Sequence, residues 1–278
     1  MYRVTTHKIG FIGGGNMARS LIGGLLAKGI APTQLWVSEP TLANRQRLQE
    51  DFGVQVCETN TQVCQEASIL LFAVKPQVLA QVAQEIATLV QQRKPLVISI
   101  AAGIRTDDVN RWLGGQCKIV RAMPNTPALI GLGATALFAN AQVEQEAKDI
   151  AQALLSAVGI SLWVEQESQL DAVTALSGSG PAYYFLFMEA MQQAAITLGL
   201  PADIASQLTL QTALGAVTMA QQSDESLTSL RERVTSPNGT TAAAIAQMEK
   251  LEFRALIQSA LVAACQRSQE LAIQLGTA

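Results

Sequence analysis

The stretch from Ile9 to Ala18, which reads I-G-F-I-G-G-G-N-M-A, limits the possible fold more than any other part of the chain. An apolar strand pattern leads into three glycines, and a helical pattern follows from Asn16. Gly13, Gly15 and Ala18 stand at the G-x-G-x-x-G/A spacing of a dinucleotide-binding turn. There the first glycine allows the tight bend, the second lets backbone N–H groups approach a pyrophosphate, and the small third residue lets the helix pack on the strand. We therefore expect a Rossmann-type unit at the start of the chain.

Strand and helix patterns alternate over the first part of the chain. The expected strands cover 8–12, 35–38, 69–74, 96–100, 118–122, 134–139 and 160–164, and the expected helices cover 16–28, 42–52, 78–90, 105–112 and 144–158. Alternation of this kind predicts a parallel sheet with helices on both faces. We place this dinucleotide-binding α/β domain at residues 1–164.

Beyond residue 164 only helical patterns remain. They cover 169–177, 181–198, 201–222, 225–234, 241–249 and 253–275, and Gly178-Ser179-Gly180 is expected to break the chain before Pro181. Residues 204–223 carry no charge, yet polar side chains lie on most sides of the predicted helix, which indicates burial in a subunit interface. We expect residues 165–278 to form an all-helical domain for oligomerisation, or dimerisation, and for substrate binding.

Composition excludes several classes of partner. The chain is 49% hydrophobic and 15% charged with a net charge of −3, which argues against a nucleic acid or an anionic membrane surface. The uncharged segments 122–143 and 204–223 contain too many prolines and polar side chains to cross a membrane. The four cysteines have no metal-ligand spacing, so we expect no metal site. No secretory leader precedes the first strand, and we expect a cytoplasmic protein with reduced thiols.

Few residues are candidates for acid–base chemistry. His7 is the only histidine, but it precedes the first strand, at the edge of the sheet opposite the ligand-binding carboxyl ends. Residues 73–76 and 99–103 do end strands on the ligand side. From position alone, Lys75 is either a phosphate or ribose ligand or an ordinary surface lysine. The small residues of 99–103 either leave room for a nicotinamide ring or serve packing.

A second informative segment, V-T-S-P-N-G-T-T at 234–241, lies between two predicted helices. Pro237 holds the turn, Gly239 is expected to allow an unusual backbone dihedral, and successive N–H groups lead into a helix start. Such a turn binds anions, and a small carboxylate suits it. The alternative is a capped turn between helices, with Ser236 or Thr240 as the N-cap.

In combination these segments resemble the pyrroline-5-carboxylate reductase family over essentially the full length of the chain. The matching motifs are F-I-G-G-G-N-M-A at 11–18, A-V-K-P at 73–76, S-I-A-A-G at 99–103, R-A-M-P-N-T-P at 121–127, D-A-V-T-A-L-S-G-S-G-P-A-Y at 171–183 and V-T-S-P-N-G-T-T at 234–241. The resemblance implies hydride transfer from a nicotinamide to the C=N bond of 1-pyrroline-5-carboxylate, giving L-proline in the last step of proline biosynthesis. An imine nitrogen takes its proton from solvent readily, so positioning suffices and no strong general acid is needed.

The resemblance also implies roles for individual residues. The substrate would contact Asp224, Ser236, Asn238, Gly239, Thr240 and Thr241, with the Thr241 hydroxyl as the catalytic donor near the imine nitrogen. The cofactor would contact Ile12, Gly13, Gly14, Gly15, Asn16 and Met17 at the pyrophosphate, Ser38 near the adenosine ribose, and Asn60, Ala73, Val74, Lys75, Pro76, Ile100, Ala101 and Ala102 over the remainder. Relatives commonly carry Gly and Ala where this chain has Asn238 and Thr240, which leaves the backbone donors in place. In the family the turn meets the cofactor of a neighbouring subunit, in a homodimer assembled into a homodecamer.

The choice between the two nicotinamide cofactors depends on Glu39. A carboxylate at the end of the second strand usually favours the free 2′-hydroxyl of NADH and repels the 2′-phosphate of NADPH. The resemblance instead favours NADPH, with Ser38 and Arg45 as candidates to hold the phosphate. We expect NADP(H) as the cofactor, with NADH as an alternative donor.

Two rival functions remain open from the sequence. A β-hydroxyacid dehydrogenase would need a lysine one turn after the Gly-x-Gly that opens a helix of the second domain. This chain has Tyr184 there, and Lys250 is its only lysine after Lys148. A non-catalytic nucleotide-sensing oligomer would not need a carboxylate-binding turn at 234–241.

Overall fold

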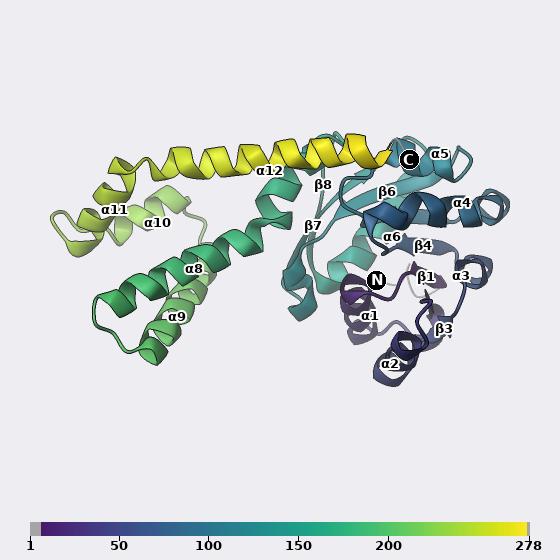
Figure 1. Cartoon of the computed structure of the whole chain (residues 1–278), viewed down its shortest axis with the longest axis horizontal. Coiled ribbons are helices and arrows are strands. Elements are labelled where there is room, and N and C mark those ends of the chain that lie inside the picture. The colour runs from purple at the N-terminus through teal and green to yellow at the C-terminus, as the bar shows by residue number, and fades with distance from the viewer. Residues whose placement is uncertain (1–6, 277–278) are drawn as a thin grey trace. The chain divides into compact units, whose positions relative to one another are not determined.

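One eight-stranded sheet organises the first part of the computed structural model, which describes residues 7–276 of the chain (Figure 1). The strand order is β3-β2-β1-β4-β5-β6-β7-β8. The strands are β1 (Ile9–Ile12), β2 (Leu35–Ser38), β3 (Gln55–Cys57), β4 (Ile69–Phe72), β5 (Leu96–Ser99), β6 (Lys118–Met123), β7 (Gly133–Ala139) and β8 (Gly159–Trp163). The order reverses between β1 and β4, as in a doubly wound dinucleotide-binding fold, which confirms the predicted fold class.

Helices and short helical turns connect the strands. Those of the sheet region are α1 (Asn16–Ala27), η1 (Pro32–Gln34), α2 (Leu42–Phe52), α3 (Asn60–Glu66), α4 (Pro76–Arg93), α5 (Thr106–Trp112), η2 (Thr126–Ile130), α6 (Gln145–Leu155) and η3 (Ser156–Val158). The remaining chain forms α7 (Gln169–Val173), the π-helix η4 (Thr174–Gly178), α8 (Gly180–Thr197), α9 (Ala202–Gln221), α10 (Leu227–Arg233), α11 (Thr240–Lys250) and α12 (Phe253–Gly276).

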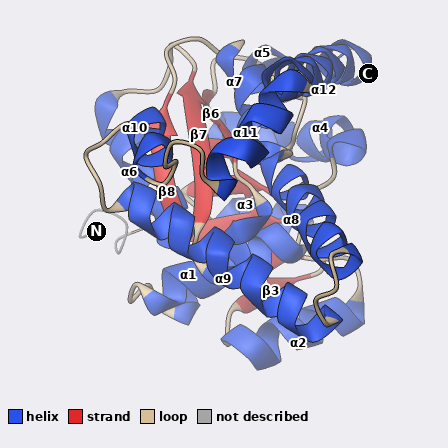
Figure 2. Ribbon diagram, turned by 90° about the vertical axis from the view of Figure 1, so that its left-hand side faces the viewer, coloured by secondary structure: helices blue, strands red, loops and turns tan. Residues whose placement is uncertain are grey.

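The sheet is apolar on both faces because helices cover both (Figure 2). Alternate residues of one strand point to opposite faces. Phe11 and Leu71 therefore join the cluster under α1, α2 and α6, whereas Ile12 and Phe72 join the cluster under α3, α4 and α5. All four side chains are fully buried. This first region thus has a hydrophobic core of its own.

The predicted parallel sheet holds for six strands, and the last two strands run in the opposite direction. β7 pairs antiparallel to β6, and β8 pairs parallel to β7, so both run against the other six. The chain between β6 and β7 holds only the short η2, whereas a parallel crossover needs a dozen or more residues. The short connection therefore reverses the direction of the chain.

Two elements, β3 and α3, were not predicted from the sequence. β3 has only three residues, too few for a strand pattern to stand out. A signal for α3 does exist, because Thr59 and Gln62 form a capping box in which the Gln62 N–H donates to the Thr59 hydroxyl. β3 extends the sheet beyond β2 as its edge strand, and α3 packs against one face of the sheet.

The glycines at 178 and 180 do not break the helix there, contrary to the prediction. The backbone passes from α7 through one π-helical turn directly into α8. The carbonyl groups of this wider turn find partners, since the Ser179 N–H donates to the Thr174 carbonyl and the Asn125 side chain donates to the Ser177 carbonyl. Such partners let a helix absorb an extra residue instead of ending.

The chain divides into two compact units. One comprises the residues up to Ser179 together with those from Ala263 onward, and the other comprises Gly180–Val262. The end of α12 belongs to the first unit, where the buried Ser268 hydroxyl donates to the buried Asp171 carboxylate at 2.7 Å. The functional boundary at 164/165 stays a prediction.

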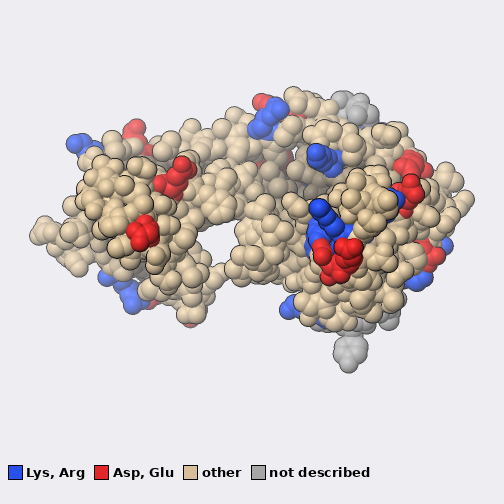
Figure 3. All heavy atoms as spheres, turned by 60° about the horizontal axis from the view of Figure 1, so that its bottom comes forward, with Lys and Arg blue, Asp and Glu red and all other residues tan. Residues whose placement is uncertain are grey.

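The helical unit, 180–262, lacks a comparable core. Of its apolar residues only Ala205 is fully buried, while large side chains such as Phe185, Leu198 and Leu214 are mostly exposed. Charges are sparse as well, and Figure 3 shows broad areas that carry neither basic nor acidic side chains. Within residues 7–276 no helix has the length and hydropathy to cross a membrane. The exposed apolar side chains of these helices indicate that they pack against another protein surface.

Candidate active site

The segments predicted to bind a dinucleotide gather at one edge of the sheet. Ile12 pairs with both Ser38 and Phe72, and Phe72 pairs with Ser99, so the carboxyl ends of β2, β1, β4 and β5 lie side by side. The backbone continues this alignment, because the Ala73 N–H donates to the Ile12 carbonyl at 2.9 Å. The edge contains the point where the strand order reverses, which is where ligands bind in such sheets.

The glycine turn after β1 has the geometry that a pyrophosphate site needs. Gly13 has a φ of +100°, and a Cβ there would lie 2.9 Å from the Ala73 carbonyl oxygen. Gly15 is the N-cap residue of α1, no side chain caps that helix, and a Cβ on Gly15 would meet nothing within 4 Å. Ala18 is fully buried against the core. The open N-terminus of α1 therefore offers backbone N–H groups to an anion.

The other predicted cofactor residues lie around this turn, and some of them are exposed whereas others are buried. Asn16 and Lys75 are exposed at the starts of α1 and α4, and Pro76 is the first residue of α4. Ala101 is buried beside its half-buried neighbours Ile100 and Ala102. The half-buried or buried remainder comprises Ile12, Gly13, Gly14, Met17, Ala73 and Val74. The edge thus combines backbone donors and one cation with small apolar residues.

Ser38 and Asn60 meet directly. The Ser38 hydroxyl, 2% exposed, donates to the Asn60 side-chain oxygen at 2.7 Å, and the Asn60 amide donates to Glu85 at 3.0 Å. The Arg45 guanidinium donates to the backbone carbonyls of Glu39 and Pro40 at 2.7 and 2.8 Å. Both side chains that the sequence suggested as phosphate ligands are therefore engaged within the protein.

In the helical unit, residues 236–239 form a tight turn. The Gly239 N–H donates to the Ser236 carbonyl at 3.0 Å, with Pro237 and Asn238 between them. Asn238, with a φ of +61°, takes the left-handed conformation, so the turn is type II. The unusual dihedral expected at Gly239 is wrong, since that residue has a φ of −83°. Asparagine tolerates the left-handed region because its short polar side chain costs little there.

The turn delivers the chain into α11 with its N-terminus uncapped. Gly239 is the N-cap residue, so the alternative of Ser236 or Thr240 as the N-cap is wrong, and no side chain accepts a hydrogen bond from the first helical N–H groups. The first backbone bond of the helix runs from Ala243 to the Gly239 carbonyl, which leaves the N–H groups of residues 240–242 without a partner inside the helix. This arrangement fits a carboxylate.

The two remaining predicted substrate residues, Thr241 and Asp224, lie in different places relative to this N-terminus. Thr241 is the second residue of α11 and is exposed. Asp224 lies in the loop between α9 and α10, and among the described residues no hydrogen bond or ion pair joins it to the turn. The structure brings the other five predicted substrate residues together in one turn and leaves Asp224 apart.

The sequence analysis missed a link between two of the motifs. The Asn125 amide donates to the Ser177 carbonyl at 3.0 Å, and its oxygen accepts from the Ala134 N–H at 2.8 Å. A Cβ on Gly178 would lie 2.5 Å from the Met123 side chain. The loop 123–127 therefore packs against the π-helical turn and bonds to it. The sequence could have indicated this contact only if the motifs at 121–127 and 171–183 had been considered together.

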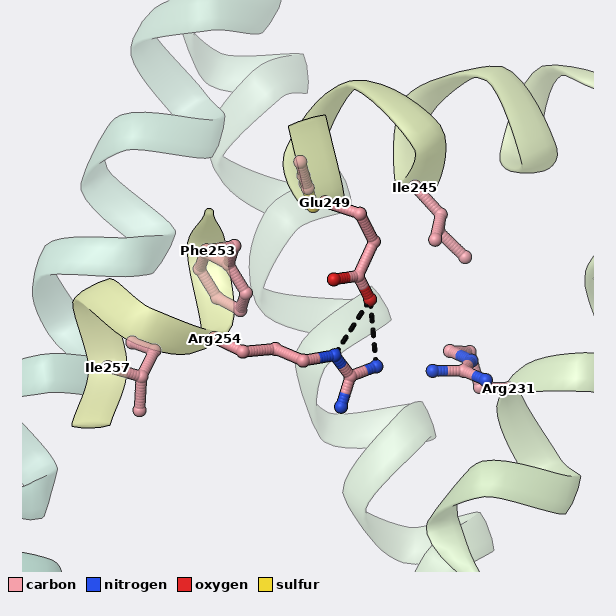
Figure 4. Close-up of a pocket in the computed structure, with 7 residues that line it drawn as sticks. Arg231, Ile245, Glu249, Phe253, Arg254 and Ile257 are labelled. Carbon is pink, nitrogen blue, oxygen red and sulfur yellow. Dashed lines mark hydrogen bonds and ion pairs between the residues drawn. The ribbon is translucent and has the colours of Figure 1, made fainter. Parts of the chain in front are cut away.

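Two pockets of the structure lie away from the predicted residues. One, about 380 Å³ in volume, lies among α10, α11 and α12, where Arg254 pairs with Glu249 at 2.8 Å beside Arg231 (Figure 4). Hydrogen bonding from Arg254 holds the pKa of the Glu249 carboxyl below its ordinary value. The other, about 450 Å³, lies beside α1 and η2. Neither is lined by a predicted site residue.

Known proteins resemble both regions of the chain. Residues 167–271 match the family model for pyrroline-5-carboxylate reductase dimerisation, and residues 8–103 match that for coenzyme F420-dependent NADP oxidoreductase. The pyrroline-5-carboxylate reductase of Pseudomonas aeruginosa is 50% identical over 98% of this chain and 100% of its own length, and that of Arabidopsis thaliana is 40% identical over 95% of each.

Solved structures agree with these matches. The pyrroline-5-carboxylate reductase of Coxiella burnetii has a TM-score of 0.92 at 44% identity, covering 96% of this chain and 99% of its own. The Plasmodium falciparum enzyme, solved with NADP bound, has a TM-score of 0.85 at 30% identity, covering 97% and 99%. The similarity therefore extends across both units.

Proposed function

The chain belongs to the pyrroline-5-carboxylate reductase family, and from that relationship we propose how its own residues carry out the reaction. The protein is an NAD(P)H-dependent oxidoreductase that reduces 1-pyrroline-5-carboxylate to L-proline, the final step of proline biosynthesis. The relatives do not favour the two rival functions, the β-hydroxyacid dehydrogenase and the nucleotide sensor.

The cofactor is held by the carboxyl edge of the sheet. NADP(H) is the cofactor, with NADPH as the proposed donor and NADH as an alternative, and the reduced nicotinamide supplies the hydride. The glycine turn 13–15 and the N-terminus of α1 bind the pyrophosphate through backbone N–H groups. Residues 100–102 leave room for a flat ring because they are small or half-buried. Lys75, exposed at the start of α4, offers its cation to a ribose or phosphate.

The observation that carries the substrate assignment is the uncapped N-terminus of α11 behind a type II turn. The N–H groups of its first turn and the Ser236 and Asn238 side chains bind the substrate carboxylate, and a Cβ on Gly239 would lie 3.1 Å from the Ser236 carbonyl oxygen, a tight contact. The helix dipole adds to the attraction. Asp224 stays the weakest member of this set, since it lies in a separate loop.

Thr241 supplies the hydroxyl beside the imine nitrogen. Its side chain lies one residue into α11, next to the N–H groups that hold the carboxylate. The hydride adds to the imine carbon, and the nitrogen gains its proton from solvent through the Thr241 hydroxyl. Histidine has no part, because His7 lies before β1 and its Nδ1 is 3.0 Å from the Ser68 hydroxyl.

The protein forms oligomers through its dimerisation region. We further propose that homodimers assemble into a homodecamer and that the turn 236–241 meets the cofactor of a neighbouring subunit. The exposed apolar side chains of α8 and α9 support the dimer. We also propose the cytoplasm as its compartment, in keeping with four free cysteines.

The test is a Thr241→Ala variant assayed by absorbance of the reduced nicotinamide. We expect kcat to fall by about 100-fold with the dissociation constant for the dinucleotide unchanged, and Thr241→Ser to restore most of the rate. Thr228→Ala, an exposed threonine on α10, is the matched control and should retain full activity. Wild-type turnover in Thr241→Ala would refute the donor assignment. No oxidation of NADPH or NADH by the parent protein on addition of 1-pyrroline-5-carboxylate would refute the function itself.

A further inference from the structure

The Glu39 carboxylate is held against the glycine turn from three directions. It accepts hydrogen bonds from the Gly14 N–H at 3.3 Å, the Thr41 N–H at 3.2 Å and the Asn44 amide at 3.2 Å. The residue is half-buried and follows directly after β2. Because these three contacts come from the turn, from the loop after β2 and from α2, the carboxylate has a defined place at the dinucleotide edge.

No cation in the described part of the chain balances this carboxylate. The nearby Arg45 guanidinium donates to the Glu39 and Pro40 backbone carbonyls, and its closest carboxylate is that of Glu58, 3.9 Å away. Arg19, on α1, is paired with Asp51 and lies 5.0 Å from the Phe52 ring centre. At the adenosine end the Glu39 carboxylate therefore has no ion-pair partner among the described residues, and the Arg45 guanidinium is directed to backbone carbonyls of the same loop.

Ser38 adds no donor for an anion. Its hydroxyl hydrogen is committed to Asn60, whose own amide is committed to Glu85. A 2′-phosphate at the end of β2 would meet the acceptor oxygens of Glu39, and the Ser38 hydroxyl, already donated to Asn60, offers it no hydrogen. A ribose with free hydroxyls would instead donate to the Glu39 carboxylate, which suits a diol.

We propose that Glu39 shifts the cofactor preference of this protein toward NADH, by binding the adenosine ribose hydroxyls of NADH and disfavouring the 2′-phosphate of NADPH. The inference rests on the proposed function only in that a dinucleotide binds at the glycine turn. The phosphate and the carboxylate repel one another because both are anionic and the half-buried setting screens them poorly. NADPH remains a usable donor, but with a penalty that this one side chain imposes.

A purely structural role for Glu39 predicts something different. If the carboxylate only holds the loop to the Gly14 N–H, its loss weakens NADH and NADPH by the same factor. If it selects between them, its loss changes the ratio of the two dissociation constants. The ratio therefore separates selection from loop stabilisation.

The experiment compares Glu39→Gln and Glu39→Ser with the parent protein, without substrate. Fluorescence titration measures the dissociation constants of NADH and NADPH, and competition with adenosine 5′-monophosphate and adenosine 2′,5′-bisphosphate isolates the ribose end. We expect the ratio of the NADPH to the NADH dissociation constant to fall by about tenfold or more in both variants, because a close like charge shifts an equilibrium by at least this factor. The second variant guards against failure of the first to fold.

Glu50→Gln is the matched control, since Glu50 is an exposed carboxylate on α2 and holds no part of the turn. Its ratio should stay within about twofold of the parent value, as expected for an exposed, screened charge. An unchanged ratio in both Glu39 variants, or an equal loss of both cofactors, would overturn the proposal. A shifted ratio in a protein that does not reduce 1-pyrroline-5-carboxylate would support this inference while refuting the proposed function.

Discussion

The sheet unit and the helical unit bury their apolar residues in opposite ways. In the first, strands such as β1 and β4 are buried from end to end, and helices close both faces of the sheet. In the second, α8 and α9 pack on each other but leave their large apolar side chains exposed. A lone chain would not gain enough burial from such helices to offset the entropy of ordering them. The difference indicates that the first unit has a complete hydrophobic core within one chain, whereas the second completes its core only with another chain.

The helical unit therefore depends on another copy for its stability. Its apolar surface spreads over several helices rather than one patch, which is typical of large, obligate interfaces. The match of residues 167–271 to a dimerisation region agrees with this reading. The turn proposed to bind substrate lies in this unit, so we expect activity to depend on assembly as well.

The largest predicted effect comes from a charge on the exposed apolar face. Leu214 of α9 is 60% exposed, and we expect Leu214→Asp to disrupt the dimer and abolish activity, because burying an unpaired carboxylate in an interface costs several kcal/mol. Light scattering after size exclusion measures the assembly.

The matched control is Leu42→Asp. Leu42 is also 60% exposed, but it lies in the first turn of α2 in the sheet unit, where an acidic residue suits the helix dipole. We expect its stability to stay within about 0.5 kcal/mol of the parent protein. A dimeric Leu214→Asp protein with the parent thermal midpoint would contradict the comparison.

A smaller effect is predicted inside the sheet unit, at a buried ion pair. Arg121 of β6 donates to Glu167 at 3.2 Å, and Glu167 also accepts from the Thr106 N–H at 2.7 Å and hydroxyl at 2.8 Å. Because Arg121 is only 4% exposed, Glu167→Ala leaves a buried charge unpaired and should cost roughly 3–5 kcal/mol in denaturant unfolding.

Glu144→Ala serves as the control for this second change. Glu144 pairs with Lys118 at 2.5 Å, but both side chains are exposed, so the denaturation midpoint should not move measurably. Equal midpoints for the Glu167 and Glu144 variants would show that the buried network contributes no more than a surface pair.

The smallest effect is expected at the thiols of the sheet unit. Cys57, Cys64 and Cys117 are buried, and burial raises the pKa of the Cys64 thiol to about 11. At pH 8 these thiols should resist alkylation equally in the parent protein and in Leu214→Asp, because the unit keeps its fold without the dimer. Mass spectrometry of alkylated peptides identifies the reacted residues, and rapid labelling of Cys64 in the dissociated variant would show that the first unit also depends on assembly.

The raised pKa of the Cys64 thiol also makes the free energy of unfolding of this unit depend on pH in alkaline solution. The pKa of Cys64 is raised in the folded chain, so the unfolded chain loses this proton first as the pH rises from its ordinary value of 9.0. Stability therefore falls between about pH 9 and pH 11 and is unaffected by this group below that window.

Much of the sheet unit was predictable because its signals are local. Apolar runs predicted seven of the eight strands near their observed positions, and the glycine spacing identified the turn at 13–15. The reversal of β7 was not predicted, because strand direction follows from how a short connection closes rather than from the strand's own residues. Residues 236–241 do lie together at one turn, and their contact with substrate stays a prediction; the left-handed residue of the turn proved to be Asn238 rather than Gly239.

By itself, the sequence determined the class of fold, the dinucleotide turn and the family, because glycine spacing and hydrophobic periodicity act over a few neighbouring residues. Only the tertiary structure decided that Asn125 seats the π-helical turn at Ser177 and that Glu39 lies against Gly14. It also decided that Ser38 and Arg45 are engaged elsewhere. These are contacts between segments far apart in the chain, and their partners are set by how the strands stack in the sheet, which no local pattern encodes.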